Sequence, residues 1–252
     1  MTSRRDALPS EPTRHAPVLR RIAGALALLS VAVLLAFGPR PAMAQSDSAK
    51  AGSAQGDQAR LVERARLTLE QLTSDPEFDD LNRYLKNAEA VLIVPQLIKG
   101  GFIVGGEGGS AVLLARAQDG TWSPPAFYTL GAASIGLQIG GQVSQVVFTI
   151  MNRDALAQVL DTQIKVGADA SIAVGPIGKG LEASTTGNFG ADIYAFAKTE
   201  GLFGGGAFEG ALIKARASYN EAYYGRAATP REIVLQGTVS NPQADGLRRA
   251  LP

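Results

Sequence analysis

The stretch "VPQLIKGGFIVGGEGGSAVLLAR", from Val94 to Arg116, decides how the rest of the chain is interpreted. It holds six glycines between Gly100 and Gly109, a single lysine, and apolar residues on both sides. A glycine loop can hold a phosphate group, which would favour a nucleotide-dependent enzyme. Glycines inside strand-like sequence can instead mark bulges, bends or close approaches of the backbone, which would favour a packed β structure.

The spacing of the glycines argues against a nucleotide site. A P-loop needs Gly-x-x-x-x-Gly-Lys-Ser/Thr, and the segment around Gly178-Lys179 lacks the first glycine and the hydroxyl residue. The residues from Gly106 to Ala111 match Gly-x-Gly-x-x-Ala, but no acidic residue closes a βαβ unit about 20 positions later. We therefore interpret most of the glycines as architectural, because repeated glycines across several strands permit sharp sheet curvature.

The first 44 residues are predicted to form a signal peptide. Basic residues precede an uncharged apolar run from Ile22 to Phe37, and Ala42-Met43-Ala44 is a small-x-small cleavage signal. The run is shorter than the about 20 residues of a membrane span, although an uncleaved anchor is the alternative. We expect cleavage after Ala44 and a periplasmic or secreted protein that can associate peripherally with a membrane. Residues 45–57 are expected to be a flexible leader, and residues 58–252 a single domain.

Cleavage would change the chemistry that the chain can support. Lys plus Arg would fall from 24 to 18 and Asp plus Glu from 23 to 21, which moves the formal charge from +1 to −3. This charge does not favour nucleic acid as a partner. The one histidine, His15, would be lost, and the chain has no cysteine. Histidine-assisted nucleophiles and zinc or copper sites are thus largely excluded, and no cofactor is expected, whereas carboxylate catalysis and calcium or magnesium sites remain open.

The periodicity predicts an α+β fold with helices at both ends and a largely antiparallel, curved sheet or barrel between them. The first helix is predicted within residues 57–73, and its apolar residues recur at helical spacing at Leu61, Ala65, Leu69 and Leu72. A second helix should begin at Pro76, with Ser74 or Asp75 as its cap. Further helices are predicted after Asn152 and after the capping box that begins at Thr229.

Four carboxylates in or beside strand-like segments are the candidates for acid–base chemistry, namely Glu107, Asp169, Asp192 and Glu209. Two of them facing one cleft could catalyse hydrolysis. Such residues are more often solvated or bonded to turn amides, so we predict that the protein is not an enzyme.

The basic residues are the candidates for ligand contact. Lys99, Lys179, Lys198 and Lys214 lie at strand ends or turns, where several could gather on one rim of the sheet. Arg60, Arg64 and Arg66 lie on the first predicted helix, whose apolar stripe could dock on the sheet or enter a membrane interface. The sequence favours docking on the sheet, with the arginines on the solvated face.

Five segments together resemble the SYLF domain, which also occurs in eukaryotic lipid-binding and actin-regulating proteins with SH3 or FYVE modules. The resemblance runs from about Arg60 to Leu235 and is carried by "AVLIVPQLIKGGFIVGGEGGSAVLLAR", "WSPPAFYTLGAASIGLQIGGQVSQVVFTIM", "KVGADASIAVGPIGKGLEA", "ADIYAFAKTEGLFGGGAFEGALI" and "NEAYYG".

The resemblance implies a lipid-binding protein. Eukaryotic members associate with phosphoinositide-containing membranes, and some yeast members bind and bundle actin. By position, Arg60, Arg64 and Arg66 match the family's N-terminal membrane-binding region, while Lys99 lies in "IKGG" and Lys179 in "GPIGKG". We expect a non-enzymatic protein of the bacterial envelope that recognises an anionic or phosphoinositide-like lipid, with actin an unlikely partner in that compartment. The alternative is a structural or interaction protein of the envelope that binds another protein through its sheet.

Overall fold

A computed structural model describes residues 44–101, 104–135, 140–161, 163–166, 168–169, 171–177, 191–201 and 211–252. The chain divides into two compact units, Met1–Ser46 and Asp47–Pro252, and the fold is that of the second unit. The predicted signal peptide lies outside the described residues except for Ala44, and so do Lys179 and Glu209.

The described elements alternate helices with a long run of strands. In chain order they are α1 (Ala44–Thr73), a 3-10 turn η1 (Pro76–Phe78), α2 (Asp79–Asn87), β1 (Ala90–Gly101), β2 (Val104–Ala115), β3 (Ala126–Ile135), β4 (Gly140–Ile150), α3 (Arg153–Asp161), β5 (Gln163–Lys165), β6 (Ile172–Ile177), β7 (Ile193–Gly201), β8 (Leu212–Ala215), α4 (Ala217–Tyr224), α5 (Pro230–Val234), a 3-10 turn η2 (Pro242–Ala244) and α6 (Asp245–Ala250).

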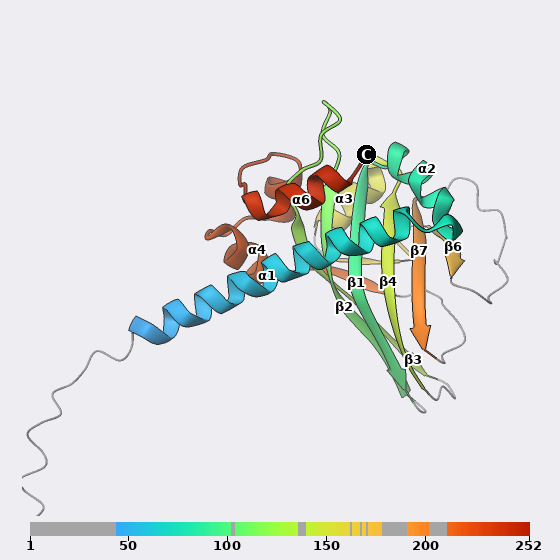
Figure 1. Cartoon of the computed structure of the whole chain (residues 1–252), viewed down its shortest axis with the longest axis horizontal. Coiled ribbons are helices and arrows are strands. Elements are labelled where there is room, and N and C mark those ends of the chain that lie inside the picture. The colour runs from blue at the N-terminus through green and yellow to red at the C-terminus, as the bar shows by residue number, and fades with distance from the viewer. Residues whose placement is uncertain are drawn as a thin grey trace, which may run out of the picture. The chain divides into compact units, whose positions relative to one another are not determined.

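The strands form one curled sheet with the order β5-β8-β3-β2-β1-β4-β7-β6 (Figure 1). Every neighbouring pair is antiparallel except β6 and β7, which are parallel. The predicted α+β class with a largely antiparallel sheet is therefore confirmed. The parallel pair is an addition that the strand pattern did not predict.

Helices cover the sheet on both faces, which gives the protein two apolar cores. On one face, α1 and α2 cross the sheet with α6 beside them (Figure 1). The predicted stripe of α1 is buried there against β-strand residues, together with Phe78, Leu81 and Leu85 of η1 and α2. On the other face, α3 and α5 pack against the alternate residues of the strands. Each fully buried leucine stabilises this arrangement by about 1.5–3 kcal/mol relative to exposure.

The predicted helix signals are present in the structure. The Asp75 side chain caps η1 by accepting a hydrogen bond from the backbone N–H of Glu77, and Asn152 caps α3 by accepting one from Ala155 at 2.8 Å. Thr229 and Glu232 form the predicted reciprocal capping box at α5. Each of these bonds satisfies a backbone donor that the first helical turn leaves unpaired.

Helix α1 is longer than the sequence indicated. It begins at Ala44, so residues 45–57, for which a flexible leader was expected, are helical. No proline interrupts this segment before the amphipathic part of the helix. Propagating an existing helix costs far less than nucleating one, which explains how the helix extends through the segment.

A β-bulge in β1 changes which side of the sheet its residues face. Ile93 pairs with Val112 and Gln96 with Ser110, so β1 carries one residue more than β2 between these pairs. Val94 and Leu97 consequently both belong to the core beneath α3 and α5, although they are three residues apart. Beyond the bulge, Ile98 faces the side of the sheet on which α1 lies.

Candidate functional site

Below α1, no helix among the described residues covers the sheet (Figure 1). We term the exposed sheet face the strand residues of this region whose side chains lie on the same side of the sheet as α1. By alternation and register they are Gln96, Ile98, Gly100, Gly106, Gly108, Ser110, Thr129, Gly131, Gly141, Val143, Gln145, Leu212 and Lys214. Ile98, Val143 and Leu212 are the large aliphatic side chains of this face, with exposed fractions of 55%, 41% and 40%.

These three aliphatic side chains lie in one row across the sheet. The register joins Leu212 to Gly131, Gly131 to Gly108, Gly108 to Ile98, and Ile98 to Val143. A Cβ added at Gly108 would come no closer than 3.9 Å to another atom, and one at Gly131 no closer than 3.6 Å. These are ordinary van der Waals distances, so packing does not require glycine at either position. Because the glycines have no side chains, the three aliphatic side chains project beyond the backbone between them.

A polar row runs beside the aliphatic row and has a lysine at each end. It follows the register from Lys214 through Thr129, Ser110 and Gln96, passes the bulge, and ends with Gln145 and Lys198. Lys198 and Lys214 therefore share one face of the sheet, but they lie at opposite ends of this row, on β7 and β8, and do not gather at one point.

A pocket of about 300 Å³ opens where the bulge in β1 meets α1. We term it the bulge pocket, and it is lined by Arg64, Pro95, Gln96, Val143, Ser144, Gln145 and Lys198. The Nζ atom of Lys198 lies 2.9 Å from Oδ2 of Asp75, in the turn that follows α1, and both side chains are partly exposed. Arg64 is exposed and has no ion pair within the described part of the chain.

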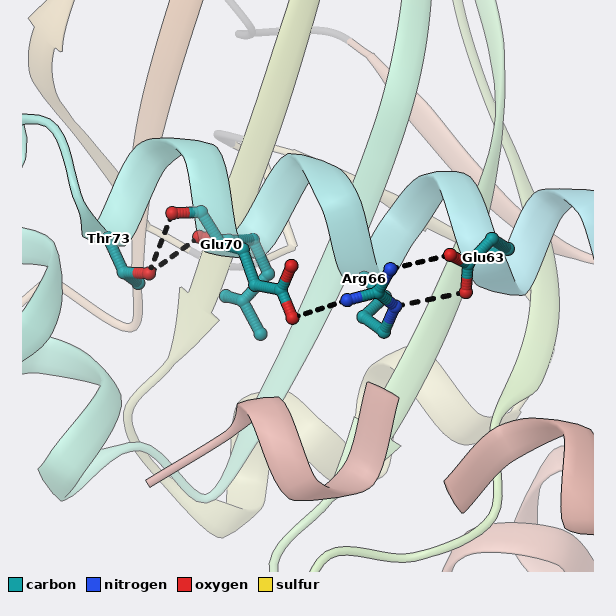
Figure 2. Close-up of polar contacts among 5 residues, drawn as sticks. Glu63, Arg66, Glu70 and Thr73 are labelled. Atoms are coloured by element: carbon teal, nitrogen blue, oxygen red, sulfur yellow. Dashed lines mark hydrogen bonds and ion pairs between the residues drawn. The ribbon is translucent and has the colours of Figure 1, made fainter. Parts of the chain in front are cut away.

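The structure separates the three predicted arginines. Arg60 is exposed and pairs with Asp57 one turn earlier in α1. Arg66 lies between Glu63 and Glu70, and its guanidinium nitrogens approach each carboxylate to 2.6 Å (Figure 2). Hydrogen bonding to Glu63 and then to Glu70 raises the pKa of Arg66, and the Arg66 hydrogen bond lowers the pKa of Glu63.

Only Arg64 of the three arginines lines the bulge pocket. Arg66 is directed toward α6, where a Cβ on Gly246 would lie 3.2 Å from its Cδ atom. Because α1 places residues three and four apart on one side, Arg60 and Leu67 share the exposed side of the helix with Arg64. Leu67 is 50% exposed.

Lys99 is directed to the opposite side of the sheet. It pairs in register with Glu107 in β2 and Gln142 in β4, on the side that carries Leu97 in the core beneath α3 and α5. Burial raises the pKa of the Glu107 carboxyl, and the positive charge of Lys99 opposes that rise. The structure therefore does not bring Lys99 together with Arg64.

The described carboxylates that were candidates for catalysis have separate structural partners. Asp169 accepts a hydrogen bond from the backbone N–H of Lys165, and Asp192 accepts hydrogen bonds from Asn152 and Ser171. Neither is joined to the other or to Glu107 by a hydrogen bond. Within the described ranges, no three acidic or histidine side chains gather in a manner that could hold a metal ion. None of the helices in those ranges is long and apolar enough to cross a membrane.

Comparisons with known proteins identify relatives of this chain. A family model described as "Las17-binding protein actin regulator" matches residues 131–252. "LAS seventeen-binding protein 3" of Saccharomyces cerevisiae is 34% identical over 171 residues, which are 66% of this chain and 37% of that protein. "SH3 domain-containing YSC84-like protein 1" of Homo sapiens is 31% identical over 162 residues, which are 64% of this chain and 47% of that protein.

The chain thus spans less than half the length of these curated relatives. Their names describe binding and regulatory proteins, and none of those names describes an enzyme. The matched regions include β4, β7 and β8, which contribute Val143, Lys198 and Leu212 to the surface described above. The chain is a member of the Ysc84 family, whose shared unit is the SYLF domain.

Proposed function

We propose that this protein is a non-enzymatic domain that binds an anionic lipid surface through the exposed sheet face. The observation that carries the proposal is the row of Leu212, Ile98 and Val143, which project from a glycine surface beside a polar row with lysine at both ends. Aliphatic side chains can enter the interfacial region of a bilayer while the flanking cations contact the headgroups.

Both kinds of contact are needed for stable adsorption. A basic side chain near an anionic membrane contributes about 1 kcal/mol, so Arg64, Lys198 and Lys214 would give weak binding by themselves. The three aliphatic side chains are about half exposed, and burying the remainder adds about 1 kcal/mol each. Together these terms support reversible binding in the micromolar to millimolar range.

The apolar stripe of α1 does not supply this membrane contact. Leu61, Ala65, Leu69 and Leu72 are at most 3% exposed, because they pack against the sheet. An interfacial helix has to present such a stripe to the lipid. In this proposal α1 contributes Arg64, whereas the charge of Arg60 is paired with Asp57 and the apolar stripe remains in the core.

The compartment forms part of the proposal. The basic, apolar and small-residue pattern of residues 1–44 supports export to the bacterial envelope, where anionic phospholipid is the expected ligand. The relatives named for binding to Las seventeen and the family described as actin regulators supply precedent for a binding role. In the envelope we do not expect actin as the partner.

Vesicle flotation tests the proposal. The protein from Gln45 onward should float with phosphatidylcholine vesicles that contain phosphatidylglycerol and remain behind with phosphatidylcholine alone. Replacing Ile98 and Val143 together by glutamate should abolish flotation, because it places two charges in the aliphatic row. Leu235→Glu is the matched control, since Leu235 is 50% exposed but follows α5, on the other side of the sheet. Absence of flotation with every anionic composition would refute lipid binding.

A protein partner is the second candidate. An exposed aliphatic row on a sheet also fits a flat protein surface, and "LAS seventeen-binding protein 3" is itself named for binding another protein. This function predicts co-purification of one defined envelope protein, its loss in the Ile98→Glu, Val143→Glu variant, and no response to vesicles of any composition.

A further inference from the structure

We infer that the bulge pocket is a subsite for a singly charged phosphodiester headgroup. The inference rests on the proposed function, because it names the lipid group that the same side of the sheet would select. Val143 belongs to both features, since it lines the pocket and lies in the aliphatic row. A headgroup in the pocket would therefore place its glycerol and acyl chains next to Val143 and Ile98.

The bulge creates the space for such a group. Between the pairs Val94–Val146 and Leu97–Ser144, β1 has one more residue than β4, so the two strands cannot pair continuously there. Pro95 lies in this interval and has no backbone N–H to donate to a neighbouring strand. The volume of about 300 Å³ lies at the lower end of the range for ligand pockets, which suits a polar headgroup better than an acyl chain.

The lining of the pocket supplies donors for a phosphate. The Arg64 guanidinium can donate two parallel hydrogen bonds to phosphate oxygens, and the side-chain amides of Gln96 and Gln145 are further donors. No carboxylate is among the residues that line the described pocket. A phosphate offers only acceptors, so this lining matches its hydrogen-bonding requirement.

The charge of the pocket selects among phosphates. The charge of Lys198 is balanced by Asp75 at 2.9 Å, whereas no described acidic residue pairs with Arg64. The net charge contributed by these three groups is therefore +1. A phosphodiester, as in phosphatidylglycerol, carries one negative charge and is neutralised by this arrangement. A phosphomonoester or a multiply phosphorylated inositol would leave negative charge uncompensated beside Asp75.

Single substitutions on α1 distinguish a specific headgroup subsite from general electrostatic attraction to an anionic membrane. Arg64→Gln should weaken binding to phosphatidylglycerol vesicles about tenfold, the loss of one charge-assisted contact. Arg64→Lys, which keeps the charge without the planar fork, should lose about threefold. Arg60→Gln removes the same charge one turn away and should change binding less than twofold. Equal losses for Arg60→Gln and Arg64→Gln would overturn the subsite and leave the proposed membrane function intact.

The Asp75–Lys198 pair provides a second test with a gain of function. Asp75→Asn keeps an acceptor for the cap of η1 but frees the charge of Lys198, which raises the net charge of the three groups to +2. The ratio of binding to phosphatidic acid over phosphatidylglycerol, measured on vesicles of equal surface charge, should then rise about tenfold at pH 8. An unchanged ratio would overturn the assignment of headgroup charge to this pocket.

A soluble probe distinguishes a lipid headgroup from free phosphate. In spectra of the ¹⁵N-labelled protein, dihexanoyl phosphatidylglycerol below its micelle concentration should shift the side-chain amides of Gln96 and Gln145. Inorganic phosphate at the same concentration should shift them far less, because it lacks the contact of the glycerol and acyl groups with Val143. Equal shifts from both would show that the pocket binds free phosphate, and no shift from either would overturn the subsite even if vesicles are bound.

Discussion

Gly109 in β2 lies directly against the bulge in β1 at Gln96. A Cβ on Gly109 would lie 2.6 Å from the carbonyl oxygen of Gln96 and 2.8 Å from Cγ1 of Val94. Side chains do not tolerate such distances, so the bulge and the glycine are parts of one structural unit. Steric contact with β1 therefore requires glycine at position 109, whereas the space around Gly108 would accept a Cβ.

The substitution Gly109→Ala should destabilise the protein by about 1–3 kcal/mol, because the β1 backbone would have to move away from β2. Gly108→Ala is the matched control on the neighbouring residue, and its effect should stay within about 0.5 kcal/mol. Urea denaturation followed by circular dichroism measures both values. Equal stabilities for the two variants would show that the bulge can relax without cost.

The bulge also explains why the exposed sheet face was not predicted from the sequence. Leu97 and Ile98 are adjacent apolar residues, and period-two alternation does not say which of them faces the core. Pro95 within a strand was the available signal for a bulge. The signals that were predicted correctly, such as the Asn152 cap and the capping box at Thr229, depend on residues within one helical turn.

The different environments of Arg60, Arg64 and Arg66 could be predicted only in part from the sequence. The spacing of Glu63, Arg66 and Glu70 is that of helical ion pairs, so the pairing of Arg66 could have been predicted. The position of Arg64 could not, because it depends on how α1 is rotated against the sheet and on where the bulge lies. The parallel pairing of β6 with β7 likewise depends on contacts that local sequence does not encode.

Arg116 connects three segments that are distant in sequence. Its guanidinium donates hydrogen bonds to the carbonyl oxygens of Leu85 at 2.9 Å and Pro252 at 3.1 Å, and it lies 4.4 Å from the ring centroid of Trp122. Arg116→Lys should lower the free energy of unfolding by about 2 kcal/mol or more, because one ammonium group cannot contact all of these partners at once. Arg153→Lys should cost less than about 0.5 kcal/mol, since Arg153 is exposed and forms one loose pair with Glu89. Thermal denaturation compares the two, and similar losses would contradict the role of Arg116.

Glu107 should make the protein less stable as the pH rises. Burial raises the pKa of this carboxyl, with Lys99 opposing the rise, so the folded state binds the proton more tightly than the unfolded state. Stability then falls from the unfolded pKa, about 4.3, up to the raised folded pKa, and stays lower above it. Glu107→Gln should therefore exceed the wild type in stability at pH 7 and match it near pH 3.5. Glu221→Gln, an exposed substitution on α4, should show no such difference. Urea denaturation of the wild type and both variants at the two pH values measures these differences. If Glu107→Gln were less stable than the wild type at pH 7, the ionised Glu107 carboxylate would stabilise the fold, contrary to the prediction.

Asp192 should act in the opposite direction. Its carboxylate accepts hydrogen bonds from the Ser171 hydroxyl at 2.6 Å and the Asn152 amide at 2.7 Å, and these bonds, chiefly that from Ser171, lower its pKa. The folded state thus binds the proton less tightly than the unfolded state. The resulting stability is complete above the unfolded pKa of about 3.9 and is lost as the pH falls through the lower folded value. Asp192→Asn should lower stability at pH 7 and flatten the acid limb of the stability curve. An acid limb that persists in Asp192→Asn would show that another carboxylate links the start of α3 to proton binding.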